Sequence, residues 1–176
     1  MKNKKLLTFL IICFLTVIFT FSKTLDIFVA QQVWDLPDFI KTPFEYITLL
    51  GDASIYIVIA VLAFALNFRS SDNEDRKQLL DFSFHLFLTV ATTGVLAQII
   101  KHSVSKARPR EFFYNHIYGF KFFKFKHDYA SFPSGHTTII VAAALVFSHF
   151  FPKYKTVFWG TAGIVALSRI MLNEHY

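Results

Sequence analysis

Residues 79–100 read LLDFSFHLFLTVATTGVLAQII, a stretch in which Asp81 is the only Asp, Glu, Lys or Arg. A helix needs about 20 mostly apolar residues to cross the hydrocarbon core of a bilayer, and this stretch is long and apolar enough to do so. The whole chain has the same character, because 54% of its 176 residues are apolar and 17% are charged. A soluble domain carries about 25% charged residues. The composition therefore predicts a membrane protein.

Further apolar stretches lie on either side of this one, at residues 6–22, 43–68, 136–151 and 156–172. Together the five stretches predict an all-α, multi-pass transmembrane helix bundle, folded as a single domain over residues 1–176. The first span also resembles a signal peptide. No small-x-small cleavage site follows it, which favours an uncleaved anchor.

The segments on either side of residue 40 carry local helix signals. Within residues 25–33, apolar side chains recur at helical spacing beside polar ones, which predicts a short helix lying in the membrane interface, an ordinary loop being the alternative. The second span is expected to begin at Pro43, with Thr42 as its N-cap and Glu45 completing a capping box.

The distribution of charge predicts the orientation of the chain. Lys and Arg number 18 against 12 Asp and Glu, a net charge of +6. Cytoplasmic loops of membrane proteins are enriched in Lys and Arg, so the lysines within residues 2–5 place the N-terminus in the cytoplasm. The same orientation places seven Lys and Arg residues of the loop 101–135 outside. Either the orientation is reversed or this loop is positive for another purpose, and the motifs below favour the second.

Groups of polar residues follow the third span, precede the fourth and end the fifth. Successive transmembrane helices alternate in direction, so the three groups are expected at the same end of the bundle. In the first group, Lys101 and Arg108 are seven residues apart, which places them on one face if the helix continues that far. Pro109 then ends the helix.

The second group, SFPSGH at residues 131–136, is a turn that opens the fourth span. Such a turn presents the free N–H groups and the positive dipole end of a helix, which suit a phosphate. In the third group, Arg169 lies near the end of the fifth span and His175 follows it. A buried arginine in a span is costly unless it is used.

These residues have the chemistry to hold and cleave a phosphate. Lys101, Arg108 and Arg169 can neutralise its oxygens, the arginines as two-pronged donors. His136 and His175 can divide the roles of nucleophile and proton donor to the leaving alcohol. No carboxylate cluster accompanies them, and the chain has one cysteine. The pattern therefore predicts removal of phosphate with no metal or other cofactor.

The spacing of the three groups resembles the signature motifs of the type 2 phosphatidic acid phosphatase family, whose fold is shared with vanadium haloperoxidases. The matching residues are Lys101 with Arg108-Pro109, then Pro133-Ser134-Gly135-His136, then Ser168-Arg169 with five residues before His175. The resemblance implies that His175 attacks phosphorus and becomes a phosphohistidine, and that His136 protonates the departing oxygen. It also implies that the phosphate is held by Lys101, Arg108, Ser134, Gly135 and Arg169.

The same resemblance implies a six-helix transmembrane core, an active site on the outer face of a bacterial cytoplasmic membrane, and lipid phosphates or pyrophosphates as substrates. No nucleic-acid partner is expected, and the sequence leaves the individual lipid and the oligomeric state open. In the family, an Asp four residues beyond the motif histidine orients the nucleophile. The sequence ends at Tyr176, so it is expected to be a fragment or a truncated product in which His175 lacks this partner.

Two other functions remain as alternatives at this point. A site without the orienting Asp predicts a non-catalytic membrane protein that binds lipid phosphates or other anions. A vanadate-dependent peroxidase would use the same residues, but the membrane setting disfavours it.

The segment FKFFKFK at residues 120–126 alternates aromatic and basic side chains. Such a pattern can bind single-stranded nucleic acid. Beside membrane spans, it favours an interfacial belt that attracts anionic headgroups. The histidines outside the motifs are expected to pack between helices or to lie in loops, and Asp52 is expected only to face a polar pocket.

Overall fold

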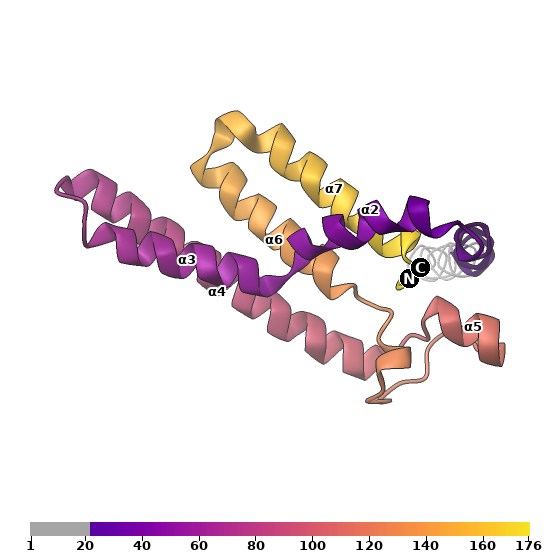
Figure 1. Cartoon of the computed structure of the whole chain (residues 1–176). Coiled ribbons are helices and arrows are strands. Elements are labelled where there is room, and N and C mark those ends of the chain that lie inside the picture. Colours follow the sequence, from indigo (N-terminus) through magenta and orange to yellow (C-terminus); the bar gives the residue numbers. More distant parts are fainter. Residues whose placement is uncertain (1–21) are drawn as a thin grey trace, which may run out of the picture.

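The computed structural model describes residues 22–176, whose regular structure is helical (Figure 1). Residues 22–34 form a helix that Figure 1 leaves unlabelled. It is followed by α2 (Asp38–Thr48), α3 (Ala53–Asn67), α4 (Asn73–Val104), α5 (Pro109–Asn115), α6 (Gly135–Phe150) and α7 (Lys155–Met171). The predicted all-α fold and the predicted helix at residues 25–33 are confirmed. The predicted span 6–22 lies outside the described residues, apart from Ser22.

Side chains that accept backbone hydrogen bonds mark where three of the helices begin. Asp52 and Asp72 precede α3 and α4, and each accepts from the N–H two residues further on at 2.8 Å. Ser134 precedes α6, and its Oγ accepts from the N–H of Thr137 at 3.4 Å. N-caps of this kind satisfy donors that have no partner in the first helical turn. The cap at Ser134 fixes the turn that carries His136.

The expected start of the second span is wrong. α2 begins at Asp38, and Pro43 lies inside it. The start is set by Pro37, whose carbonyl accepts hydrogen bonds from the N–H groups of Ile40 and Lys41. Thr42 Oγ1 donates to the carbonyl of Asp38 at 2.8 Å, so Thr42 belongs to the helix and does not cap it.

The second span is also broken. A 3₁₀ turn at Leu49–Gly51 ends α2, and the helix pair bends by 43° before α3 continues. A Cβ atom at Gly51 would lie 2.7 Å from the Cβ of His136, closer than side chains can approach. Glycine is therefore required at the break, where the chain touches the first turn of α6.

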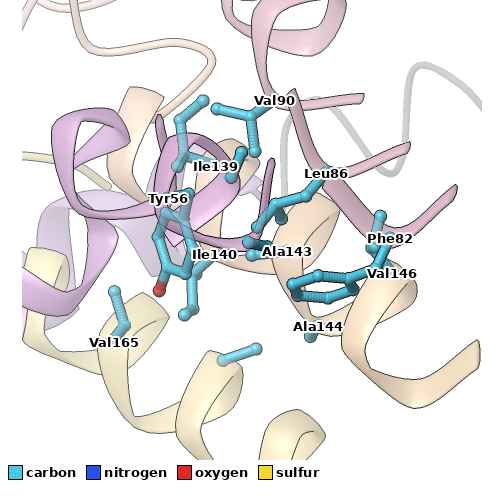
Figure 2. Packing of buried hydrophobic residues seen from close by; sticks show 13 residues of the cluster. Tyr56, Phe82, Leu86, Val90, Ile139, Ile140, Ala143, Ala144, Val146 and Val165 are labelled. Carbon is cyan, nitrogen blue, oxygen red and sulfur yellow. The ribbon is translucent and has the colours of Figure 1, made fainter. Parts of the chain in front are cut away.

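α3, α4, α6 and α7 pack around a shared apolar core, in which Leu86 and Val90 of α4 lie near Ile139 and Ala143 of α6 (Figure 2). Leu86, Ala143 and Val165 have no exposed surface. Small residues such as alanine allow neighbouring helices to approach closely. The outward-facing side chains of α3 and α4 are also apolar, and several are more than half exposed: Val58, Val61, Leu62, Val95, Leu96 and Ile99. An apolar outer surface of this kind suits lipid rather than water.

Among the described helices, α4 is long and apolar enough to cross a membrane. The bent pair α2–α3 meets the same requirement when it is counted as one span. α6 has 16 residues and α7 has 17. Both are shorter than a usual span, which needs about 20 residues. One or two helices therefore meet the requirement, and the arrangement with five spans stays a prediction. The predicted loop 101–135 is partly helical, because it contains the end of α4, all of α5 and a 3₁₀ turn at His127–Tyr129.

Candidate active site

A cavity of about 580 Å³ opens where the ends of α4 and α7 meet the start of α6 and the break between α2 and α3. Six of the seven predicted site residues line it: Lys101, Arg108, Gly135, His136, Arg169 and His175. The seventh, Ser134, caps α6 directly before Gly135. The structure thus brings the three sequence motifs to one cavity.

The three positive side chains of the predicted site all reach the cavity, Lys101 from α4, Arg108 from the connection to α5 and Arg169 from α7. Lys101 and Arg108 do not lie on one continuing helix, because the helix ends before the expected end near Arg108. α4 ends at Val104, and Ser105 adopts a left-handed backbone conformation with φ of 48°. The chain turns there, and Arg108 enters the cavity from extended backbone.

The two arginines are almost fully buried, with 5% of Arg108 and 8% of Arg169 exposed. Nε of Arg108 donates to the carbonyl of His127 at 3.0 Å, and an Nη of Arg169 donates to Thr48 Oγ1 at 2.9 Å. Nε of Arg169 has no hydrogen-bond partner within residues 22–176. Burial and the neighbouring positive charges lower the pKa of Arg108 to about 10, so this group is still charged at neutral pH. Buried guanidinium groups with a spare donor are suited to an anion.

His175 follows α7 and is 6% exposed. Its Nδ1 lies 2.6 Å from the carbonyl oxygen of Ser131. A carbonyl only accepts hydrogen bonds, so Nδ1 carries the proton and Nε2 keeps its lone pair. Burial, together with the positive charges of Arg108 and Arg169, lowers the pKa of His175 to about 3. The imidazole is therefore neutral at physiological pH, which is the form that a nucleophile requires.

The segment that carries His175 is held from two directions. The N–H of His175 donates to the carbonyl of Arg169 at 3.2 Å, which closes the chain back onto the end of α7. Asn173 Nδ2 donates to the carbonyl of Ala30 at 3.1 Å. This second contact ties the segment to the helix at residues 22–34, so that helix supports the cavity although it does not line it.

His136 is the second residue of α6 and is partly buried in the cavity wall. It lies against Gly51 and close enough to Asp52 for the two charges to interact. Asp52 lines the same cavity, in agreement with the polar pocket expected for it. A carboxylate beside an imidazole favours the protonated ring, which here opposes the effects of burial and of the positive charge of Arg169.

The cavity is also lined by side chains that the predicted site lacks, among them His102, His127 and Glu174. Glu174 is ion-paired with Arg108, and its Oε2 lies 3.8 Å from an Nη of Arg169. Its carboxylate thus engages the two guanidinium groups that are predicted to bind phosphate. Position in the sequence could have indicated two of these residues, because His102 follows Lys101 and Glu174 precedes His175.

The lining of the cavity suits an anion better than a metal cation. Within the described part of the chain, no group of three or more His, Cys, Asp or Glu side chains is arranged to bind a metal ion. The charged groups that converge are mainly positive, and the first turn of α6 adds backbone N–H groups without helical partners.

Comparison with known proteins agrees with this geometry. Residues 82–176 match the model of the PAP2 superfamily. The curated relatives include a lipid A 1-phosphatase from Rhizobium etli, 31% identical over 147 residues, and one from Rhizobium johnstonii, 30% identical over 139 residues. The matches cover 80% and 75% of this chain but 63% and 57% of those relatives, and no solved structure matches the chain significantly. With the family match covering more than half of its length, this chain belongs to the PAP2 superfamily.

Proposed function

We propose that this protein is a membrane phosphatase that hydrolyses a lipid-linked phosphate or pyrophosphate through a phosphohistidine, without a metal ion. The observation that carries the proposal is the convergence of Lys101, Arg108, Arg169, His136 and His175 on one cavity beside the start of α6. The names of the relatives support a lipid A type of substrate, with the phosphate at its 1-position as the group removed.

Binding uses the positive groups. The two arginines and Lys101 hold the non-bridging oxygens of the phosphoryl group, with the N–H groups at the start of α6 as further donors. These donors are fixed before the substrate arrives, because α4, α6 and α7 pack around a common core. Preorganised donors stabilise the charge that develops in the transition state.

Chemistry then proceeds in two steps. In the first, Nε2 of His175 forms a bond to phosphorus while the bond from phosphorus to the lipid oxygen breaks, and His136 gives that oxygen a proton. In the second, His136 takes a proton from a water molecule, whose oxygen attacks the phosphohistidine. The bond to His175 breaks, and inorganic phosphate leaves. The order requires His175 to be neutral and His136 to be protonated at the start.

The proposed setting is a bacterial cytoplasmic membrane with the N-terminus in the cytoplasm and the cavity on the outer face. Residues 79–100 of α4 extend about 33 Å at 1.5 Å per residue, close to the thickness of about 30 Å of a hydrocarbon core. Lys101 then lies at the level of the lipid headgroups, where a lipid phosphate is found. The bent α2–α3 pair and the shorter α6 and α7 complete the spans of the described chain.

The proposal is tested by measuring release of inorganic phosphate from lipid phosphates in detergent micelles containing excess EDTA. We expect steady release by the protein, with a lipid A 1-phosphate among the substrates tried. Saturable binding without release would support the non-catalytic alternative. Oxidation of bromide in the presence of vanadate and peroxide would support the peroxidase.

The charge state of His175 gives a prediction about pH. Because its pKa is lowered to about 3, the ring is expected to stay neutral as the pH falls from 7 to 5. Protonation removes the attacking lone pair. Any loss of activity due to His175 is therefore expected to begin at a pH well below about 6.5, the ordinary pKa of a histidine. NMR titration of ¹⁵N-histidine-labelled protein, with His175→Gln for assignment, measures this directly. Titration of His175 near 6.5 would contradict the burial on which the prediction depends.

The contact of Glu174 with the arginines gives a second prediction. Glu174→Gln removes the negative charge that competes with phosphate for Arg108 and Arg169. Since hydrogen bonds to charged groups contribute about 1.5–3 kcal/mol, we expect inorganic phosphate to inhibit the variant at a concentration about tenfold lower. Glu111→Gln is the matched control, because Glu111 accepts a hydrogen bond from Asn115 and does not line the cavity. An unchanged inhibition constant in the Glu174 variant would show that its carboxylate does not compete.

A further inference from the structure

Residues 121–126, KFFKFK, form a surface that the proposed mechanism does not use, and we call them the basic-aromatic loop. The rings of Phe122, Phe123 and Phe125 are 60%, 70% and 73% exposed. The basic side chains between and beside them are exposed as well: Lys121, Lys124 and Lys126. Exposed apolar groups that cluster on a surface mark a site of interaction.

The loop is held by hydrogen bonds to the end of α4. The N–H groups of residues 121–123 donate to the carbonyls of residues 105, 104 and 103 at 3.0, 3.3 and 3.2 Å. Ser105 Oγ donates to the carbonyl of Lys124 at 3.0 Å and accepts from its N–H at 2.9 Å. The carbonyls of a last helical turn have no partner within the helix. The loop supplies those partners, and this fixes its backbone against α4.

The backbone conformation directs the phenylalanine rings outward at some cost. Phe122 and Phe123 have φ values of 41° and 54°, a left-handed conformation that bulky residues rarely adopt. Two such residues in a row form a tight turn whose side chains are exposed. The fold therefore maintains an exposed aromatic surface where a polar turn would be the usual choice.

The place of the loop in the bundle indicates what it contacts. With residues 79–100 across the hydrocarbon core, the turn at residues 103–105 and the loop bonded to it lie at headgroup depth. Aromatic rings are enriched at that depth, and lysines there are attracted to anionic lipids. Figure 1 shows the loop between α4 and α6 at the same end of the molecule as α5 and the chain's C-terminal end.

The loop also borders the cavity. Phe125 and Lys126 contribute to its lining. The ring of Phe125 stacks on that of His102, with centroids 5.1 Å apart and planes inclined by 26°. Because His102 is next to Lys101, a lipid that contacts the loop lies at the entrance to the phosphate-binding residues.

We propose that the basic-aromatic loop docks the entrance of the cavity onto anionic lipid headgroups. Its phenylalanine rings enter the headgroup layer, and its lysines pair with lipid phosphates. The proposal rests on the proposed function in one respect, namely that the substrate is a lipid. Docking of the loop onto headgroups does not require the protein to turn over a substrate. It also differs from generic membrane contact, since it requires anionic lipids in particular.

The test places a reporter in the loop of the whole chain, in nanodiscs of phosphatidylcholine alone or mixed with phosphatidylglycerol. A Cys13→Ser background allows an environment-sensitive dye at Phe123→Cys, with Ser71→Cys in the α3–α4 connection as the matched control. We expect the dye at residue 123 to be quenched by brominated lipid, and more strongly in the anionic discs. The dye at residue 71 should not respond. The same result is expected in a His175→Ala background, so a failure of the proposed function leaves this test unaffected.

Charge is tested with Lys121→Gln/Lys124→Gln. A lysine near an anionic surface contributes about a fivefold preference for anionic over neutral lipid. The double variant should therefore lose most of the response to phosphatidylglycerol. The parent should lose it in high salt, which screens the charges. Three results would overturn the proposal: a dye at residue 123 as unquenched as that at residue 71, quenching that is equal in neutral and anionic discs, or a response to anionic lipid that the double variant retains. Protection of the dye by a single-stranded oligonucleotide but not by lipid would assign the loop to nucleic acid instead.

Discussion

Replacing His175 with alanine is expected to lower kcat for phosphate release by about 10⁴-fold or more, as removal of a catalytic nucleophile does. KM should change little, because the arginines and Lys101 remain to hold the phosphate. The buried position of His175, its neutral state and its hydrogen bond to the Ser131 carbonyl suit Nε2 to the proposed attack. Phosphate release is measured with a lipid phosphate in detergent micelles.

Two further measurements separate a lost nucleophile from a damaged fold. His149→Ala removes a histidine at the other end of α6, away from the cavity, and should keep near-normal activity. His175→Gly should regain part of its activity when imidazole is added, because the free ring can fill the space and attack phosphorus. Labelled phosphate should remain on the parent protein after denaturation in alkali, where phosphohistidine is stable, and should be absent from His175→Ala. Normal turnover by the alanine variant would remove His175 from the mechanism.

The sequence contains enough information to predict that the motif residues meet. Apolar stretches of helical length alternate with short polar links, so the ends of successive helices must fall on alternating sides. Lys101, His136 and Arg169 each lie within a few residues of such an end. Their convergence follows from helix direction alone, without any knowledge of how the side chains pack.

The details that adjust the site depend on contacts that sequence spacing does not encode. The left-handed turn at Ser105 redirects Arg108, which a continuing helix would have placed elsewhere. The partner of His175 is a backbone carbonyl, at Ser131, and every residue type has one. A motif of side chains therefore gives no indication of it. The structure thus gives Nδ1 of His175 a backbone carbonyl as its partner, where the family resemblance implies an Asp.

The break between α2 and α3 could not be predicted for a related reason. Residues 43–68 are mostly apolar, and the short interruption at Gly51 and Asp52 is a weak signal within so long a stretch. Its role depends on the approach of His136, which comes from a distant part of the chain. The break gives the site Asp52, and it shortens the straight helical length that the sequence predicts for this span.

Replacing His136 with alanine should have an effect that depends on the leaving group. A general acid contributes about 10²–10⁴-fold, so phosphate release from a lipid phosphate, whose alkoxide must be protonated, is expected to fall by about 10³-fold. p-Nitrophenolate leaves without a proton, so formation of the phosphohistidine from p-nitrophenyl phosphate should stay within about tenfold of the parent. Rapid-mixing measurements of p-nitrophenol release compare the two proteins.

The second step makes this prediction sharper, because His136 is also the proposed base for water. With p-nitrophenyl phosphate, His136→Ala should release a burst of about one p-nitrophenol per protein and then turn over slowly, while phosphohistidine accumulates. With the lipid phosphate it should show no burst. If the rate of the first step fell equally for both substrates, His136 would be excluded as the proton donor. A lost burst with unchanged phosphate binding would instead place His136 among the groups that position the phosphoryl group for His175.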